Sequence, residues 1–531
     1  MTTTTPAENR AKPSVTKRSS SKNKPAKKKK SERQVTTIAE TEFMRSLRNR
    51  GLRWQARLEA RGPDRALPWL IAVVLFVIFE GLALARFRSL ELGSELAAWM
   101  QGVWLVGENQ DPFVTLTGRN LFEGQFSLIM WPIAQLGRIV PAGPLLLTLQ
   151  AIALAIAVVP LWRIARSVLD HGVETALVLV AAYGVQPQLH NLNLSEFHPE
   201  ALSVPAFLWA YLFSQDKHWV RYGLMVAFAL STRSDLGLVV IGLGALLAIE
   251  GRTEAGRITA AVGAIWAALA LLVFNADLAG GEFAFEDAFA TYGDTPVAIL
   301  WGMLTNPIQV LSDFFAEENF TKLLLLFAPW LFLPVLRPRF QLPLALFGAF
   351  SFIAAIPQGE FLNAQQDVAA LAFLPIAAAF ALRSVGRRSV QRVFVSLRLL
   401  GGVLFASAAF FLFASGSSLY NDPWDWGVRT TNDVDVIAAT ELVEPGDSVT
   451  AIARALPLLT ERTSLLEFPV GIDVYRPADD IFRSDVIIVD EADPAWTATG
   501  QFTFGAVVAA SGFVVEDRFG SISLYRLETE E

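Results

Sequence analysis

Eleven apolar runs, each close to the length that crosses a lipid bilayer, dominate the sequence. A transmembrane helix needs about 20 predominantly apolar residues, and shorter ones are tolerated inside a bundle. Hydrophobic residues make up 53% of the 531 residues and charged residues 18%, which excludes an ordinary soluble protein. We therefore predict an all-α polytopic membrane protein. The predicted spans cover residues 67–86, 143–162, 172–189, 198–214, 219–233, 235–250, 257–275, 321–336, 340–357, 367–383 and 396–415.

A twelfth apolar stretch, FSLIMWPIAQLGRIV (126–140), has two interpretations, and basic residues distinguish them. With eleven spans and the N-terminus inside, thirteen Lys and Arg residues fall in inner loops and six in outer loops. Cytoplasmic loops normally carry the excess of Lys and Arg, and a twelfth span would invert every later loop. We therefore predict that 126–140 is re-entrant or interfacial.

The N-terminal segment, residues 1–66, carries 18 Lys and Arg against 6 Asp and Glu. Its first part has almost no large apolar residue, so we expect a disordered cytoplasmic tail that contacts anionic lipid. Nucleic-acid binding is the competing interpretation of its KKKK run, and we do not predict a nucleic-acid partner. Phe43 and Leu47 are four residues apart, as are Trp54 and Leu58, and seven residues separate Leu47 from Trp54. This helical spacing among arginines predicts an amphipathic helix in the inner headgroup layer.

Residues 416–531 return to a soluble composition and contain short strand-like runs. DSVTAIA, SDVIIVDE, GFVVEDRF and SISLYRL predict strands, and NDVDVIAATELVEPG predicts a helix before the first of them. With residues 67–415 forming the helical membrane domain, an odd number of spans places 416–531 outside the cell as a small α/β domain. The predicted location is the cytoplasmic membrane, with the N-terminus in the cytoplasm.

Ionisable and polar residues gather at the predicted outer ends of several spans, where such groups usually have a partner or a function. The segment SEFHPE contains Glu196 and His198, and STRSDLG contains Arg233 and Asp235. The segment SELAAWMQGVW adds further candidates, Glu95, Trp99 and Gln101. We expect these side chains to meet in one outward-facing cavity.

Sugar transfer from a lipid phosphate donor would use such a set. A carboxylate, here Glu95, would act as general base on an acceptor hydroxyl, and a cation, here Arg233, would neutralise the departing phosphate. His198 and Glu196 would support them. The competing interpretation is structural, because Arg233 and Asp235 can pair at a helix boundary and Glu95 can simply face water. The spacing of these residues does not decide between the two.

Several segments resemble a family of predicted bacterial membrane proteins catalogued as domain of unknown function two thousand and seventy-nine. ELAAWMQGVW is similar to its "DLGxFxQxxW" segment, NLFEGQFSLIMWPIA to "NxxGxHFSPIxxxxxP", NLSEFHPEALSVPAFLWA to "DFHPxAxxxPxLLxA" and TRSDLGLVVIGLG to "REDxGLxxxxxG". The motifs follow in the same order, and the resemblance runs from residue 90 to about 527.

The resemblance implies a bundle similar to the GT-C glycosyltransferases, which use polyprenyl-phosphate-linked sugars. It places Glu95 at the family's acidic position in the first outer loop, and Gln125 and Gln366 among the substrate-binding positions. Two departures weaken any metal site, because Gln125 and the pair Gln365 and Gln366 stand where the family commonly has histidine or a histidine-tyrosine pair. No metal ligand and no certain cofactor are predicted, and a divalent cation is left open.

Three functions are compatible with the sequence. The first is a GT-C-like glycosyltransferase with membrane lipid, a polyprenyl-phosphate sugar and an envelope glycan or protein acceptor as its partners. The second is a transporter or flippase of a polar or lipid-linked substrate, although the sequence shows no convincing internal repeat. The third is a non-catalytic envelope scaffold that binds partners through residues 416–531.

Overall fold

The structure is a computed structural model, and it describes residues 57–123, 126–270, 289–353, 368–389, 392–421, 427–468, 484–492 and 512–528. The predicted basic tail, most of the predicted amphipathic helix and the candidate residues Gln125 and Gln366 lie outside these ranges.

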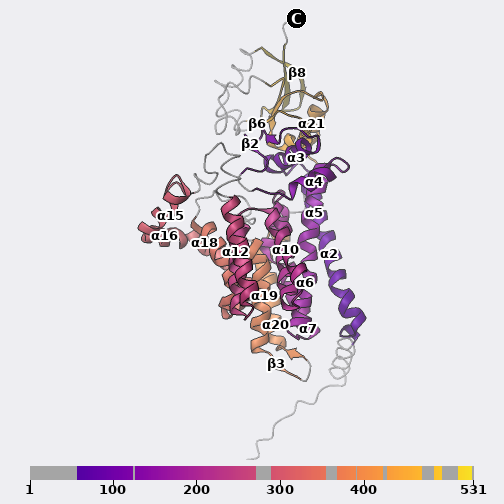
Figure 1. Cartoon of the computed structure of the whole chain (residues 1–531). Coiled ribbons are helices and arrows are strands. Elements are labelled where there is room, and N and C mark those ends of the chain that lie inside the picture. Colours follow the sequence, from indigo (N-terminus) through magenta and orange to yellow (C-terminus); the bar gives the residue numbers. More distant parts are fainter. Residues whose placement is uncertain are drawn as a thin grey trace, which may run out of the picture. The chain divides into compact units, whose positions relative to one another are not determined.

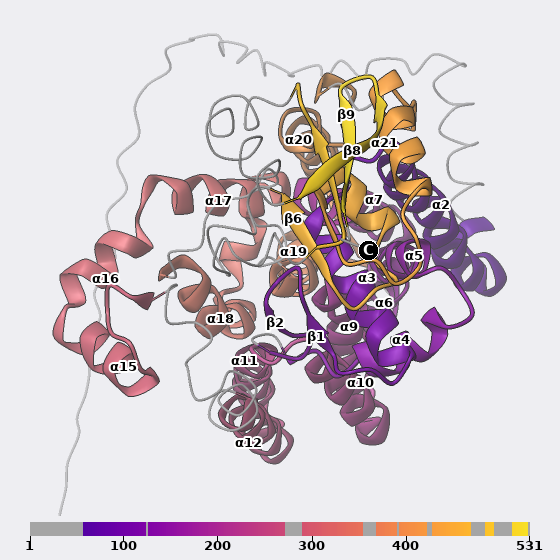
Figure 2. The same cartoon turned by 90° about the horizontal axis from the view of Figure 1, so that it is seen from above.

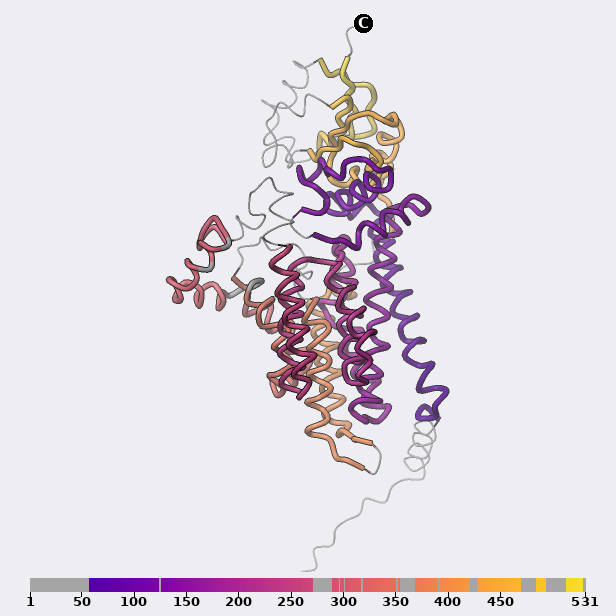
Figure 3. The backbone as a smooth tube through the Cα atoms, in the orientation of Figure 1, coloured from indigo at the N-terminus to yellow at the C-terminus, as the bar shows by residue number. Residues whose placement is uncertain are grey.

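Helices cover the predicted spans wherever the chain is described (Figures 1 and 3). Four of them are long and apolar enough to cross a membrane, namely Arg61–Arg88, Ala142–Val168, Val368–Val385 and Leu397–Ala414. Two shorter helices, Val173–Gly184 and Leu236–Ile249, are also apolar. The helices in predicted spans are α2 (Arg61–Arg88), α5 (Ala142–Ile156), α6 (Val158–Arg163), α7 (Val173–Gly184), α9 (Ser203–Gln215), α10 (Trp219–Thr232), α11 (Leu236–Ile249), α12 (Thr253–Leu269), α17 (Glu317–Phe327), α18 (Leu342–Ile353), α19 (Val368–Val385) and α20 (Leu397–Ala414).

The eighth predicted span, 321–336, is not one helix. Helix α17 ends at Phe327 and is followed by two 3-10 turns, Ala328–Trp330 and Leu333–Leu336. Leu331 and Phe332 between them have left-handed backbone angles, with φ of 51° and 55°. Pro329 and Pro334 lack the N–H that a continuing helix would use, which explains the interruption.

The ambiguous stretch 126–140 contains only a short helix, α4 (Met130–Gly137), of 8 residues. At about 1.5 Å per residue this helix is about 12 Å long, and the hydrocarbon core of a bilayer is about 30 Å thick. The prediction that this stretch is not a full span agrees with the structure.

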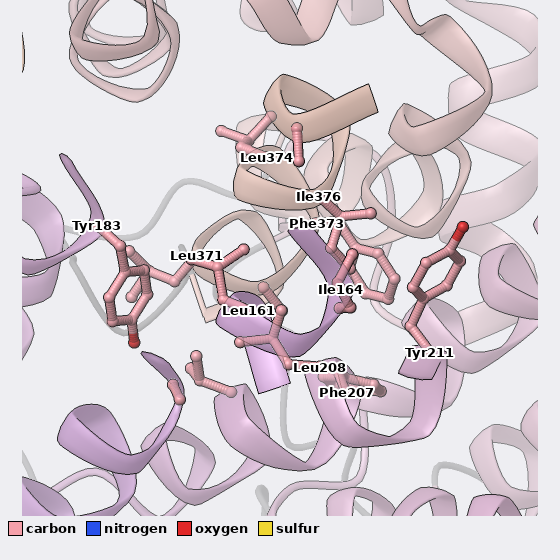
Figure 4. Close-up of a cluster of buried hydrophobic side chains, with 14 of the residues drawn as sticks. Leu161, Ile164, Tyr183, Phe207, Leu208, Tyr211, Leu371, Phe373, Leu374 and Ile376 are labelled. Atoms are coloured by element: carbon pink, nitrogen blue, oxygen red, sulfur yellow. The ribbon is translucent and has the colours of Figure 1, made fainter. Parts of the chain in front are cut away.

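The main hydrophobic core lies where α6, α9 and α19 meet (Figure 4). Phe207 of α9 and Phe373 of α19 pack with ring centres 5.7 Å apart, and Leu161 and Ile164 lie beside them. Helix α9 is apolar on all sides, as expected of a helix in the middle of a bundle. Packing in this core fixes the positions of the surrounding helices and therefore of their ends.

A buried polar helix, α8 (Pro187–Leu194), is hydrogen-bonded to two other helices of the bundle. The side chain of Asn193 donates to the Phe79 carbonyl of α2, 2.9 Å away. Asn191 donates to the Ala414 carbonyl at the end of α20, 3.1 Å away. Because α8 is fixed in this way, the segment that follows it, Ser195 to Leu202, starts from a defined position.

The C-terminal part forms one five-stranded sheet in the order β6-β5-β7-β9-β8. Strand β5 (Val449–Ile452) pairs in parallel with β6 (Leu465–Phe468) and β7 (Val486–Asp490), and the hairpin of β8 (Phe513–Phe519) and β9 (Ile522–Leu527) adds antiparallel to β7. Helix α21 (Thr431–Glu441) begins with a capping box between Thr430 and Asp433. The four predicted strands and the predicted helix are confirmed, and β6 was not predicted.

Shorter elements complete the described chain. Helix α3 (Ser94–Gly107) follows α2, and two small hairpins pair β1 (Phe113–Val114) with β2 (Arg119–Asn120) and β3 (Arg387–Arg388) with β4 (Val393–Phe394). Helices α15 (Pro296–Thr305) and α16 (Pro307–Phe314) lie beside α18, on the side of the bundle away from α2 (Figure 2).

Candidate functional site

The start of helix α3 is held by a carboxylate from a distant part of the chain. Glu196 accepts hydrogen bonds from the backbone N–H groups of Gly93, 2.8 Å away, and of Leu96. The first N–H groups of a helix have no partner inside the helix, so Glu196 acts as its cap. Burial raises the pKa of Glu196, while the bond from Gly93 lowers it and the nearby charge of Glu95 raises it further.

Gln150, which lies in the middle of apolar α5, fixes the loop that carries Glu196. Its amide donates to the carbonyl oxygens of Leu192 and Glu196, at 2.9 and 3.2 Å. Its own carbonyl oxygen accepts from the backbone N–H of His198 at 2.9 Å. This residue was not predicted, although a glutamine inside an apolar span is a signal that it has a polar partner.

Glu95 and His198 are brought together at this point. The Oε1 atom of Glu95 lies 3.5 Å from Nδ1 of His198. The His198 side chain is 2% exposed and the Glu95 side chain is 49% exposed. The carboxylate is therefore accessible to water, whereas the imidazole beside it is buried. The other ring nitrogen, Nε2, is buried and has no hydrogen-bond partner among the residues that the structure describes. Trp99, one turn further along α3, packs edge-on against Phe197 with ring centres 6.1 Å apart.

Arg233 and Asp235 meet a third residue, Glu200, which was not among the predicted site residues. The guanidinium Nη1 is 2.8 Å from Glu200 Oε1, and Nη2 is 2.9 Å from Asp235 Oδ2. Glu200 is fully buried and Asp235 is 7% exposed. Two carboxylates against one guanidinium give this buried triad a formal charge of about −1 when all three are ionised. Glu200 is the last residue of SEFHPE, two positions after the predicted site residue His198, and this position was the signal for it.

Gln101 has a different environment from the one predicted. Its side chain is fully buried, and it donates to the Thr115 hydroxyl at 2.9 Å and to the Arg462 carbonyl at 3.1 Å. Both atoms belong to the contact between α3, the loop after it and the C-terminal sheet. Gln101 therefore joins two parts of the chain in this structure.

The C-terminal sheet brings one more carboxylate to the start of α3. Glu467 on strand β6 accepts a hydrogen bond from Ser94. Burial raises the pKa of Glu467, and the bond from Ser94 lowers it. Sequence reasoning missed this residue because it missed β6, in which a lone acid interrupts the apolar run LLEF.

Among the residues that the structure describes, no three His, Asp or Glu side chains are arranged so that they could hold a metal ion. The described part of the site therefore consists of two neighbouring clusters on the segment Ser195 to Leu202. One contains Glu95, Glu196 and His198, and the other contains Glu200, Arg233 and Asp235.

A family model described as "Predicted membrane protein (DUF2079)" matches residues 89–503, which include both clusters. The chain belongs to this family. No curated protein matches this DUF2079 chain.

Among solved structures, this DUF2079 member is similar to ArnT from Cupriavidus metallidurans bound to undecaprenyl phosphate, with a TM-score of 0.51 and 11% sequence identity. The match covers 88% of this chain and 99% of that chain. The apo state of the same protein matches with a TM-score of 0.47 and 12% identity, over 86% of this chain and 99% of that chain. The first likeness shows that the DUF2079 chain has a GT-C-type fold.

Proposed function

We propose that this protein is a GT-C-like glycosyltransferase that uses a polyprenyl-phosphate-linked sugar at the outer face of the cytoplasmic membrane. The observation that supports this most directly is the water-accessible Glu95 carboxylate, held 3.5 Å from the buried His198 ring at a fixed helix start. The fold supports the same proposal, because ArnT, which shares it, was crystallised with undecaprenyl phosphate.

In the proposed reaction Glu95 accepts the proton of an acceptor hydroxyl. The acceptor oxygen forms a bond with the anomeric carbon of the sugar, the bond from that carbon to the phosphate oxygen breaks, and polyprenyl phosphate leaves. His198, with its proton on Nδ1, orients the Glu95 carboxylate toward the acceptor hydroxyl. Glu196 contributes by fixing the backbone from which Glu95 projects.

For Arg233 to bind the donor phosphate, one of its present partners must first give way. Its guanidinium is already bonded to Glu200 and Asp235, so a donor phosphate would have to replace one of them. The negative charge of a phosphate and its three acceptor oxygens suit a guanidinium well. Protonation of one carboxylate as the donor binds would leave Arg233 available for that contact.

Envelope glycan profiles of cells that express variants test the proposal. Glu95→Gln keeps the size of the side chain but removes the base, so sugar addition should fall to background while the amount of protein in the membrane is unchanged. Arg233→Ala should also abolish sugar addition, but it removes the cation of the buried triad and should lower the stability of the fold as well. Glu108→Gln, at the other end of α3 and exposed, is the matched control and should keep full activity. An unchanged glycan profile in Glu95→Gln would overturn the catalytic assignment.

One observation favours a second function, a non-catalytic envelope scaffold. Glu196, Gln101 and Arg233 all make contacts that hold segments of this chain together. On this alternative, the full chain would still co-purify with envelope proteins when Glu95 is replaced by Gln, and the glycan profile would not change. Loss of sugar addition in that variant rules the alternative out as the main function.

A further inference from the structure

Two arginines at one end of the bundle lie over a pair of stacked aromatic rings. Trp209 and Phe213 are about one turn apart on α9, with ring centres 5.3 Å apart and an angle of 27° between the rings. The guanidinium carbon of Arg163, the last residue of α6, is 5.0 Å from the centre of the Trp209 ring. That of Arg221, in the first turn of α10, is 5.8 Å from the centre of the Phe213 ring. Both distances are within the range of a cation–π contact, and we call these four residues the arginine–aromatic patch.

Both arginines of this patch are exposed. Among the residues that the structure describes, neither guanidinium forms an ion pair or a hydrogen bond. Each guanidinium has five N–H donors. Two arginines in other predicted inner loops, Arg252 and Arg339, differ in this respect, since both are paired with Glu250. The donors of Arg163 and Arg221 are therefore available to an anion from outside the chain.

The arginine–aromatic patch combines an apolar surface with a positive charge. Trp209 and Phe213 are half-buried against the main core, so part of each ring remains exposed. The turn after α9 adds one acid and one base, Asp216 and Lys217, both exposed. Together with the two arginines, these residues carry a formal charge of about +2. An anion that has an apolar part therefore fits the patch better than an inorganic ion does.

The position of the patch in the bundle indicates which anion it meets. Arg163 lies little more than one turn before the end of the helix Ala142–Val168, α9 ends at Gln215, and α10 begins at Trp219. The distribution of basic residues predicts that this end of the bundle faces the cytoplasm. The cytoplasmic leaflet carries anionic phospholipid, which attracts arginines beside a membrane span. A phospholipid of this leaflet has both the charge and the apolar part that the patch requires.

We propose that the arginine–aromatic patch binds the headgroup of an anionic phospholipid from the cytoplasmic leaflet. The guanidinium groups of Arg163 and Arg221 donate to the phosphate oxygens, a contact that the planar guanidinium suits. The rings of Trp209 and Phe213 contact the glycerol and the first carbons of the acyl chains. The inference goes beyond the proposed function, because the patch lies at the opposite end of the bundle from Glu95 and its ligand takes no part in sugar transfer.

Photo-cross-linking of the purified full chain in detergent tests the proposal. The probe is phosphatidylglycerol with a diazirine close to its headgroup, and mass spectrometry measures labelling of the peptide that contains Trp209 and Phe213. We expect labelling to saturate and to be removed by excess unlabelled phosphatidylglycerol. Phosphatidylcholine, which has no net charge, should compete about tenfold less well, and inorganic phosphate at the same concentration should not compete. Because labelling is read at this peptide, lipid bound to the basic segment 1–66 does not enter the measurement.

Variants of the two arginines test their part in the binding. Arg163→Gln and Arg221→Gln should each raise the half-saturating concentration of the probe about fivefold, since each removes one cationic contact. Arg163→Lys and Arg221→Lys keep the charge and should stay closer to the natural chain than the glutamine variants do. Arg257→Gln is the matched control, because Arg257 is exposed on α12 in a predicted inner loop and has no ring contact among the described residues. It should leave the half-saturating concentration unchanged.

Three results would overturn the proposal. Equal competition by phosphatidylcholine and phosphatidylglycerol would show that the charge of the headgroup plays no part. Displacement of the probe by inorganic phosphate as effective as that by phosphatidylglycerol would assign the patch to a free anion. A half-saturating concentration that is unchanged in both glutamine variants would exclude the arginines as the contact. If the glutamine variants do not fold, competition in the natural chain and the lysine variants still decide.

Discussion

Arg233 and Glu200 form a buried ion pair, with the guanidinium Nη1 2.8 Å from the carboxylate Oε1, although 33 positions separate them in the sequence. Removing one partner of such a pair leaves a charge without compensation in surroundings of low polarity. The pair therefore fixes the end of α10 against the turn that begins α9.

From this pair we predict an order of stability among three variants. Arg233→Met leaves two buried carboxylates without their cation and should lower the free energy of unfolding by about 3–5 kcal/mol. Asp235→Asn leaves the Arg233–Glu200 pair intact and should cost less than half as much. Glu200→Gln should lie between them. Thermal unfolding of the purified chain in detergent measures all three, and equal losses for Arg233→Met and Asp235→Asn would contradict the prediction.

We predict that the stability of the fold depends on pH through Glu196. Its pKa in the folded chain is raised by burial, so the folded state holds its proton more tightly than the unfolded state does. The contribution of the Glu196 carboxyl to the free energy of unfolding is fully present below the usual pKa of a glutamate. This contribution is lost as the pH rises through the raised pKa of the folded state. Glu196→Gln should remove this loss and flatten the profile of unfolding temperature against pH in that window.

A second variant separates the charge of Glu196 from its role as a cap. Glu196→Gln keeps one acceptor oxygen for the start of α3, whereas Glu196→Ala keeps none. The alanine variant should lose about 0.5–2 kcal/mol at every pH, as expected for a lost helix cap. A pH profile that is identical in the natural chain and in Glu196→Gln would contradict the assignment.

The helical part of the fold could be predicted because each span must by itself be apolar and long enough to cross the bilayer, so it can be recognised without knowing its neighbours. The break after Phe327 could not be predicted with the same certainty, since prolines also occur inside spans that continue, such as Pro375 in α19. Strand β6 was missed because four residues with one acid give no alternation to recognise. Its position is set by pairing with β5, which is a long-range contact.

The candidate site could be predicted in part. Glu95 and His198 were expected at the same end of the bundle, because the distribution of basic residues placed both of their loops on the outer face, and the two side chains lie 3.5 Å apart. Partners such as Gln150 and Glu467 come from other elements, and local sequence does not specify which distant group completes a hydrogen bond. Gln101 shows the same limit, since its partner Arg462 lies 361 positions away.

The contact between α3 and the C-terminal sheet depends on the Thr115 hydroxyl. This oxygen donates to the Leu465 carbonyl at 2.7 Å and accepts from the Leu465 N–H at 2.8 Å and from Gln101 at 2.9 Å. One donor and two acceptor positions are all that a hydroxyl has. Thr115→Val keeps the shape and loses all three bonds, at about 1 kcal/mol each.

Hydrogen exchange followed by mass spectrometry measures this loss locally. We expect faster exchange in peptides that contain Leu465 of the Thr115→Val variant, while peptides from α9 and α19 keep the rate of the natural chain. Thr115→Ser retains the hydroxyl and serves as the control. Unchanged exchange around Leu465 in Thr115→Val would show that the hydroxyl does not hold the edge of β6.

Single cysteines in this cysteine-free sequence test the predicted orientation in the membrane. Glu108→Cys after α3 and Glu461→Cys before β6 should react with a membrane-impermeant maleimide in intact cells. Lys217→Cys, in the exposed turn between α9 and α10, should react only after the cells are permeabilised, because the positive-inside rule places that turn in the cytoplasm. The natural chain, which has no thiol, gives the background.

Lys217 is the position that distinguishes eleven spans from twelve. If residues 126–140 crossed the membrane, every later loop would change sides, and Lys217→Cys would react in intact cells while Glu108→Cys would behave as before. The eight-residue helix α4 within this stretch, about 12 Å long, is too short for a crossing on its own. Labelling of Lys217→Cys in intact cells would therefore contradict both the charge argument and the length of α4. It would also place Glu95 and Gln101 on the opposite side of the membrane from His198, Glu196 and the C-terminal sheet, against the contacts that join them.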